Sequence, residues 1–186
     1  RFNQVPWMSW SPIDDRLGYF VRKGKFRSLV LQNIVTHEVE RLIPMDMVDE
    51  PESPDISPNG RTVAFSALQG AVGDIYLLDL DTEAVTNLTE DGFADYAPTF
   101  SPDGSYLVYV ARISGNNKLF KLDLETKAKT QLTFGTATDA AAQFLDDHTL
   151  AFASTAAGPL APIDPTQAAN ADIYNIWTLD LDNGEL

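Results

Sequence analysis

Ala97-Pro98-Thr99-Phe100-Ser101-Pro102-Asp103-Gly104-Ser105-Tyr106-Leu107-Val108-Tyr109-Val110 is the stretch that decides the fold of this chain. It predicts a short strand ending at Phe100, a turn over 101–104 and a second strand over 106–110. Pro102 sets φ for the second turn position, and Gly104 accepts the positive φ that other residues resist. The unbroken aromatic and β-branched run over 106–110 is typical of a strand buried on both faces.

The same pattern recurs along the chain. Its aligned apolar residues are Trp10, Ile56, Phe100 and Phe144, which are separated by steps of 46, 44 and 44 residues. In each unit a second pattern of strand, hairpin and strand follows, as in 118–133. A strand-only repeat of this length indicates the four-stranded blades of a β-propeller.

We therefore predict an all-β fold of four-stranded antiparallel blades, with four blades in this chain. Their expected ranges are 5–43, 44–90, 91–134 and 135–186, the last blade being incomplete. An open arc of four blades leaves two terminal faces in water. If each exposes on the order of 400 Å² of apolar surface, roughly 10 kcal/mol of burial is unrealised per face. We expect further blades from the same polypeptide or from another chain.

Charge and composition exclude several classes of partner. The net charge is −14, and residues 44–186 hold 23 of the 27 acidic side chains but only six of the 13 basic ones. Such an acidic body argues against nucleic acid as a partner, because phosphate binding needs clustered cations. The one basic cluster, over 22–27, is interpreted as a solvated hairpin. No apolar run approaches the roughly 20 residues that span a bilayer.

The sequence offers no catalytic constellation. Cysteine is absent, no Gly-x-Ser-x-Gly occurs, and the two histidines, His37 and His148, fall in turns of different blades. The pairs Asp79/Asp81, Asp123/Glu125 and Asp180/Asp182 resemble metal ligands, but each lies where a strand enters a hairpin, which favours turn capping. We predict no catalytic residue, no cofactor and no metal site.

Three motifs carry a family resemblance: Pro-x-Phe-Ser-Pro-Asp-Gly at 98–104, Leu-x-x-Leu-Asp-Leu at 119–124, and Gln-Leu-Thr at 131–133. Together they resemble the TolB-like propeller repeat, a relative of the WD repeat. The resemblance implies a non-catalytic scaffold that binds a protein or peptide at one end of the axial channel. It also implies a periplasmic or otherwise extracytoplasmic location in a bacterium. The resemblance further implies a ring of six blades or more. The repeat is also similar to the gating propellers of prolyl-oligopeptidase and tricorn-like serine peptidases, whose catalytic domain would lie outside this chain. A structural subunit of a larger assembly is a third alternative.

Two groups of residues are candidates for partner binding. The segments that lead into the first strand of each blade would surround one end of the axial channel, its mouth, with acidic side chains and one aromatic side chain. The resemblance implies that partners dock at that end. A long loop between the second and third strands of blade four, rich in alanine and proline, is the other candidate. The predicted residues are Asp49, Glu50, Asp95, Tyr96 and Asp139 at the mouth, and Pro159, Pro162 and Pro165 in the loop. An acidic mouth would favour a basic partner by speeding its arrival.

Overall fold

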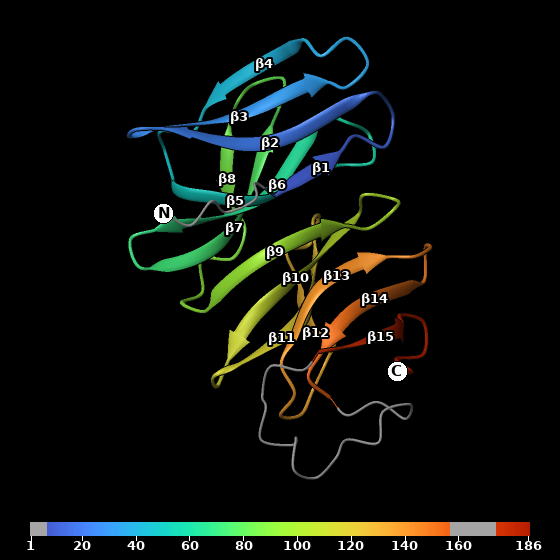
Figure 1. Ribbon diagram of the computed structural model, residues 1–186. Coiled ribbons are helices and arrows are strands. Elements are labelled where there is room, and N and C mark those ends of the chain that lie inside the picture. The colour runs from blue at the N-terminus through green and yellow to red at the C-terminus, as the bar shows by residue number, and fades with distance from the viewer. Residues whose placement is uncertain (1–6, 157–173) are drawn as a thin grey trace.

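The computed structural model describes residues 7–156 and 174–186 of the chain, and in that part every regular element is a strand. The strands form four separate sheets that follow one another along the chain (Figure 1). None of the described residues belongs to a helix long and apolar enough to cross a membrane. Blade one comprises β1 (Met8–Trp10), β2 (Arg16–Lys23), β3 (Phe26–Asn33) and β4 (Val39–Pro44); blade two comprises β5 (Asp49–Ile56), β6 (Thr62–Gln69), β7 (Val72–Asp79) and β8 (Val85–Asn87); blade three comprises β9 (Ala94–Phe100), β10 (Tyr106–Ile113), β11 (Asn116–Asp123) and β12 (Lys129–Gln131); blade four comprises β13 (Asp139–Phe144), β14 (Thr149–Ser154) and β15 (Asn175–Asp180).

Each blade is a meander in which consecutive strands pair antiparallel, and among the described residues no strand of one blade pairs with a strand of another. Blades one to three have four strands each, and three strands are described for blade four. The predicted all-β fold of antiparallel propeller blades is thus confirmed. Figure 1 shows the blades lying side by side as successive layers, blade one at the top of the view and blade four at the bottom.

The Ser-Pro-Asp-Gly segment forms the predicted turn between β9 and β10. Ser101 N donates to Tyr106 O at 2.9 Å, and Gly104 N donates to Ser101 O at 2.8 Å. Gly104 has φ +74°, a conformation that favours glycine because it has no Cβ. After this turn, Leu107, Val108, Tyr109, Val110 and Ala111 are all buried. The expectation of a strand covered on both faces therefore holds for β10.

Apolar clusters fill the three junctions between neighbouring blades. The first includes Leu29 of blade one and Phe65 of blade two, and the second includes Ile75 of blade two and Tyr109 of blade three. The third joins Val108 of blade three to Phe152 of blade four. Blades two and three thus contribute one face to the cluster before them and the other to the cluster after them, and blades one and four contribute one face each. The apolar cores of the described chain therefore lie between blades.

A polar contact repeats between the first strands of neighbouring blades. Ser9 Oγ accepts a hydrogen bond from Ile56 N at 3.0 Å, and Asp55 Oδ2 accepts one from Phe100 N at 2.6 Å. Ser9 and Asp55 are 46 positions apart, which is one repeat. Each side chain satisfies a backbone donor of the next blade that no strand partner reaches, so this position fixes how the blades stack.

One part of the repeat alignment is wrong by a residue. The sequence pattern aligns Leu42 with Leu88, yet a register shift lies between Leu31 and Gln32 in the pairing of β3 with β4. Ile43 therefore takes the inward position and is 2% exposed, whereas Leu42 faces outward and is 61% exposed. A bulge of one residue reverses which side chains face the core, because side chains alternate along a strand.

The outer face of blade one lacks a neighbouring blade within the described chain. Trp10 is 58% exposed there, whereas its counterparts Ile56 and Phe100 are 5% and 6% exposed. Met8, Val39 and Leu42 are also exposed. The apolar residues that close the other junctions are thus present at this face without a partner blade.

Candidate functional site

The two ends of the blade stack differ in chemistry. The connections between blades, residues 45–48, 88–93 and 132–138, lie at one end, which we call the crossing end. The hairpins between third and fourth strands, such as 80–84, lie at the other, which we call the turn end. The residues predicted to bind a partner at the channel mouth belong to the crossing end, where each junction between blades places charged side chains.

At the first junction, the basic cluster of blade one neutralises the acidic pair of blade two. Arg27 Nη2 donates to Glu50 Oε1 at 2.5 Å, and Arg22 Nη1 donates to the same oxygen at 3.0 Å. Asp49 Oδ1 lies 3.4 Å from Arg27 Nη1. The hydrogen bond from Arg27 lowers the pKa of Glu50 more than burial raises it. Residues 22–26 of this hairpin are exposed, as the solvated-hairpin interpretation expected, and Arg22 and Arg27 also form ion pairs across the junction.

The second junction holds Asp95, which is 1% exposed. Neither of its carboxylate oxygens has a hydrogen bond of normal geometry within the described chain. Burial is the main reason that the pKa of Asp95 is raised to about 7; the negative charges of Asp91 and Asp74 add to this, while Thr89 and Lys129 offset part of it. Asp95 is thus an unusual carboxyl group, one that exchanges a proton near neutral pH.

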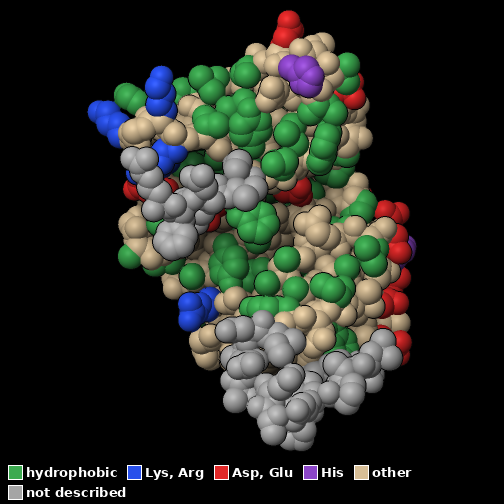
Figure 2. All heavy atoms as spheres, viewed as in Figure 1, with side chains coloured by type: hydrophobic (Ala, Val, Ile, Leu, Met, Phe, Trp, Pro, Cys, Tyr) green, Lys and Arg blue, Asp and Glu red, His purple; other side chains and the backbone are tan. Residues whose placement is uncertain are grey.

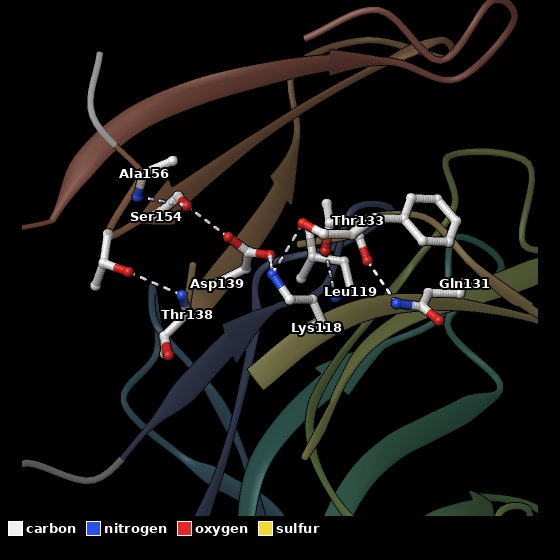
Figure 3. Close-up of polar contacts among 10 residues, drawn as sticks. Lys118, Leu119, Gln131, Thr133, Thr138, Asp139, Ser154 and Ala156 are labelled. Carbon is white, nitrogen blue, oxygen red and sulfur yellow. Dashed lines mark hydrogen bonds and ion pairs between the residues drawn. The ribbon is translucent and has the colours of Figure 1, made fainter. Parts of the chain in front are cut away.

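At the third junction a buried ion pair links blade three to blade four (Figure 3). Lys118 Nζ donates to Asp139 Oδ2 at 3.0 Å, and their side chains are 4% and 3% exposed. Ser154 Oγ donates to the other oxygen, Asp139 Oδ1, at 2.5 Å. Lys118 Nζ also donates to Phe134 O at 3.3 Å. Both charges are therefore paired and hydrogen-bonded, as buried charges must be.

The predicted mouth residues thus divide by exposure. The side chains of Asp49 and Glu50 are 66% and 42% exposed, so these two present carboxylates to solvent. Tyr96 is half-buried, and burial raises its pKa. Asp95 and Asp139 are buried within junctions and present no surface to a partner. The three loop residues Pro159, Pro162 and Pro165 lie outside the described residues.

Exposed carboxylates gather at the turn end instead. Figure 2 shows acidic side chains along the right-hand edge of the molecule, where Figure 1 places the turns of blades three and four. Acids in the hairpins of the turn end cap turns: Asp79 Oδ1 accepts from Thr82 N at 2.8 Å, and Asp123 Oδ1 accepts from Thr126 N at 2.7 Å. Such bonds lower the pKa of both carboxyls. The turn-capping interpretation of the paired acids agrees with these bonds.

The histidines stand apart from any hydroxyl nucleophile. His148 Nδ1 lies 3.2 Å from Asp182 Oδ2, and both side chains are exposed, at 65% and 70%. His37 is an exposed turn residue with φ +63°. No serine hydroxyl is hydrogen-bonded to either ring among the residues that the structure describes.

Comparison with known proteins identifies the family. The model of the TolB β-propeller domain matches residues 4–174. The chain belongs to this TolB propeller family. No curated protein sequence matches it. TolB from Acinetobacter baumannii superposes with a TM-score of 0.76 at 20% identity, over 96% of this chain and 41% of that one.

Enzymes that contain propellers are also similar in fold. Oligogalacturonate lyase from Vibrio parahaemolyticus gives a TM-score of 0.65 at 17% identity, over 97% of this chain and 50% of that one. The tricorn protease gives 0.55 at 15% identity, over 76% and 14%. The TolB-family chain described here therefore spans half or less of the length of each of these proteins, and the similarity is one of fold.

The sequence analysis did not identify the basic residues that pair with the acids of the crossing segments. Arg27 and Lys118 lie on third strands, far in sequence from Glu50 and Asp139. One available signal was the repeat itself: Lys118 occupies a core-facing position of the third strand, where a charged residue must find a buried partner. The first strand of the next blade is the neighbour that supplies it.

Proposed function

We propose that this chain is part of a non-catalytic TolB-family propeller that serves as a protein-interaction scaffold and binds a protein or peptide at the crossing end of its axial channel. The protein is extracytoplasmic in a bacterium in this proposal. Membership of the TolB propeller family supports it.

The observation that carries the scaffold proposal is the outer face of blade one. Trp10 is 58% exposed there although its repeat counterparts are buried. Exposed apolar faces of this kind mark interaction surfaces. In our proposal further blades, from the same polypeptide or from a partner chain, cover this face and complete a ring around the channel.

Binding of a basic segment at the crossing end is supported by the carboxylate of Asp49, whose side chain is 66% exposed and lies 3.4 Å at nearest from Arg27. Glu50 is 42% exposed but is paired with both Arg22 and Arg27. Charge of this kind speeds association more than it adds affinity. The experiment is to measure the association rate of a lysine-rich peptide by surface plasmon resonance. The variants are Asp49→Asn with Glu50→Gln, and a matched control, Asp81→Asn with Glu125→Gln, that removes two exposed charges from the turn end.

We expect the first variant to slow association severalfold at low salt and the control to leave the rate nearly unchanged. Because Glu50 holds Arg27, a urea titration must accompany the rates to establish that the first variant is folded. Equal rates for both variants would refute docking at the crossing end.

The second candidate is a substrate-gating propeller of a serine peptidase, favoured by the fold similarity to the tricorn protease and to prolyl endopeptidases. The rest of the open reading frame distinguishes the two. A Gly-x-Ser-x-Gly between a strand and a helix would favour the peptidase, and further propeller repeats without that motif would favour the scaffold.

A further inference from the structure

The hairpin between β2 and β3 is a basic surface on an otherwise acidic chain. Four cationic side chains lie within six residues: Arg22, Lys23, Lys25 and Arg27. Figure 2 shows Lys and Arg side chains gathered at the upper left of the molecule, where Figure 1 places this hairpin. Residues 44–186, by contrast, hold 23 acidic and six basic side chains. A partner that recognises positive charge is therefore expected to bind at this hairpin.

The arginines show which chemistry the hairpin recognises. Arg27 Nη2 donates to Glu50 Oε1 at 2.5 Å, and Arg22 Nη1 donates to the same oxygen at 3.0 Å. Asp49 Oδ1 lies 3.4 Å from Arg27 Nη1. These two acids are consecutive residues at the start of β5, an extended strand of blade two. The hairpin thus already holds one acidic, extended segment by charge-assisted contacts.

The two lysines of the hairpin are not used in this way. Lys23 and Lys25 are exposed, and neither forms an ion pair with an acid of the described residues. Asp46, in the connection that follows blade one, is also exposed and pairs with neither of them. Four cations less the two acids, Asp49 and Glu50, leave a net charge of +2 at the hairpin.

Apolar side chains stand beside these lysines. The ring of Phe26 is 60% exposed at the turn, and Lys25 Nζ lies 5.4 Å from its centroid. Met45 N donates to Arg27 O at 2.9 Å, which places the connection after blade one next to the hairpin. Met47 of that connection is 55% exposed. An exposed ring among cations can bury apolar area against a partner while the cations pair with its acids, as at interface hot spots.

We propose that the β2–β3 hairpin is a docking site for an acidic segment of a partner protein that carries an apolar residue between its acids. The acids pair with Lys23 and Lys25, and the apolar residue packs on the ring of Phe26. The ligand is opposite in charge to the basic segment proposed above. A flat anionic membrane fits less well, because a surface laid against the crossing end would also meet the exposed acids Glu90 and Asp91.

The test is fluorescence anisotropy with a short peptide of four glutamates around one phenylalanine, labelled with a neutral fluorophore. Lys23→Gln combined with Lys25→Gln should weaken binding by about tenfold or more. The matched control, Arg61→Gln with Lys127→Gln, removes two exposed cations from the turn end and should leave the affinity unchanged. Phe26→Ala should weaken binding severalfold while the dependence on salt stays that of the wild type, because it removes apolar contact and no charge.

A further variant separates this site from the acidic one. Asp49→Asn with Glu50→Gln frees Arg22 and Arg27, so it should strengthen binding of the acidic peptide while it slows association of the lysine-rich peptide. The two proposals therefore fail independently.

Equal affinities of the lysine variant and its control would overturn docking at the hairpin, as would absence of saturable binding of the acidic peptide by the wild type. Vesicles of phosphatidylcholine with about 30% phosphatidylglycerol are the competing ligand. If the wild type binds these vesicles and the lysine variant does not, while the peptide is not bound, a membrane is the ligand and the proposal is wrong.

Discussion

Replacement of Lys118 by methionine is the sharpest test of how blades three and four are joined. The variant keeps most of the side-chain volume but leaves Asp139 buried, with only the Ser154 hydroxyl as a partner. At 3.0 Å the Coulomb attraction of the pair is about 5–6 kcal/mol at an effective dielectric constant of 20, before desolvation is subtracted. Removing one partner of a buried pair typically lowers the free energy of unfolding by about 3–5 kcal/mol, and we expect Lys118→Met to fall in that range.

Urea unfolding followed by circular dichroism measures this loss of unfolding free energy. Two further variants show whether the loss comes from the burial of the ion pair. Lys129→Met breaks an ion pair with Asp91 whose side chains are 28% and 31% exposed, and it should lower stability by under about 1 kcal/mol. Lys118→Met combined with Asp139→Leu removes both charges and should recover most of the loss. Equal effects of Lys118→Met and Lys129→Met would refute the reasoning, because burial would then make no difference to the pair.

Three other predictions follow from packing, backbone geometry and titration. Phe65→Ala, which removes a fully buried ring from the first cluster, should lower the unfolding free energy by about 3–5 kcal/mol in urea, and a loss under 1 kcal/mol would contradict the packing. Gly60 and Gly24 both have positive φ, but a Cβ at Gly60 would lie 2.6 Å from Ile13 Cδ1 and one at Gly24 meets nothing within 4 Å; thermal melts should therefore show a larger loss for Gly60→Ala than for Gly24→Ala. The pKa of Asp95 is raised to about 7 in the folded protein from an ordinary value near 3.8, so the folded state holds an extra proton between these two values and stability should rise as pH falls from about 7 to about 4, by up to about 1.4 kcal/mol per pH unit; Asp95→Asn should flatten this slope, and an unchanged slope would exclude Asp95 as its cause.

The architecture was predictable because its signals are local and repeated. The apolar residue that ends each first strand, as at Ile56 and Phe100, recurs at the repeat length and is buried in a junction. The turn after it carries residues whose backbone preferences fit only one geometry. Repetition of the pattern gave independent copies of the same inference, so the error of any one copy mattered little.

Details that depend on a single copy were not predictable. The bulge that turns Leu42 outward and Ile43 inward has no residue that marks it in the sequence. Both are large aliphatic residues, so either fits the core-facing position. Only the pairing with β3 decides between them, and pairing depends on neighbours that are distant in sequence.

The charged junctions were hidden for a related reason. The acids of the crossing segments were identified by position, but whether each is exposed depends on the third strand of the preceding blade. That strand presents Arg27 to Glu50 and Lys118 to Asp139, from neighbouring rather than equivalent positions of the repeat, since Lys118 aligns with Ser28 of blade one. The start of the third strand therefore determines whether a mouth acid is paired, and no single position of the repeat does.

This division between apolar and polar positions has a physical basis. The clusters around Phe65, Tyr109 and Val108 supply the burial that stacks the blades, and a buried ion pair adds little net stability beyond what well-packed apolar residues would give. The polar position in each junction is thus under little constraint from the stacking itself. The charged residues there can differ from blade to blade while the backbone stays the same, as the Arg27–Glu50 pair of the first junction and the Lys118–Asp139 pair of the third show. Functional differences among the blades are therefore expected at these polar residues rather than at the apolar ones, because there the chemistry can change without loss of the fold.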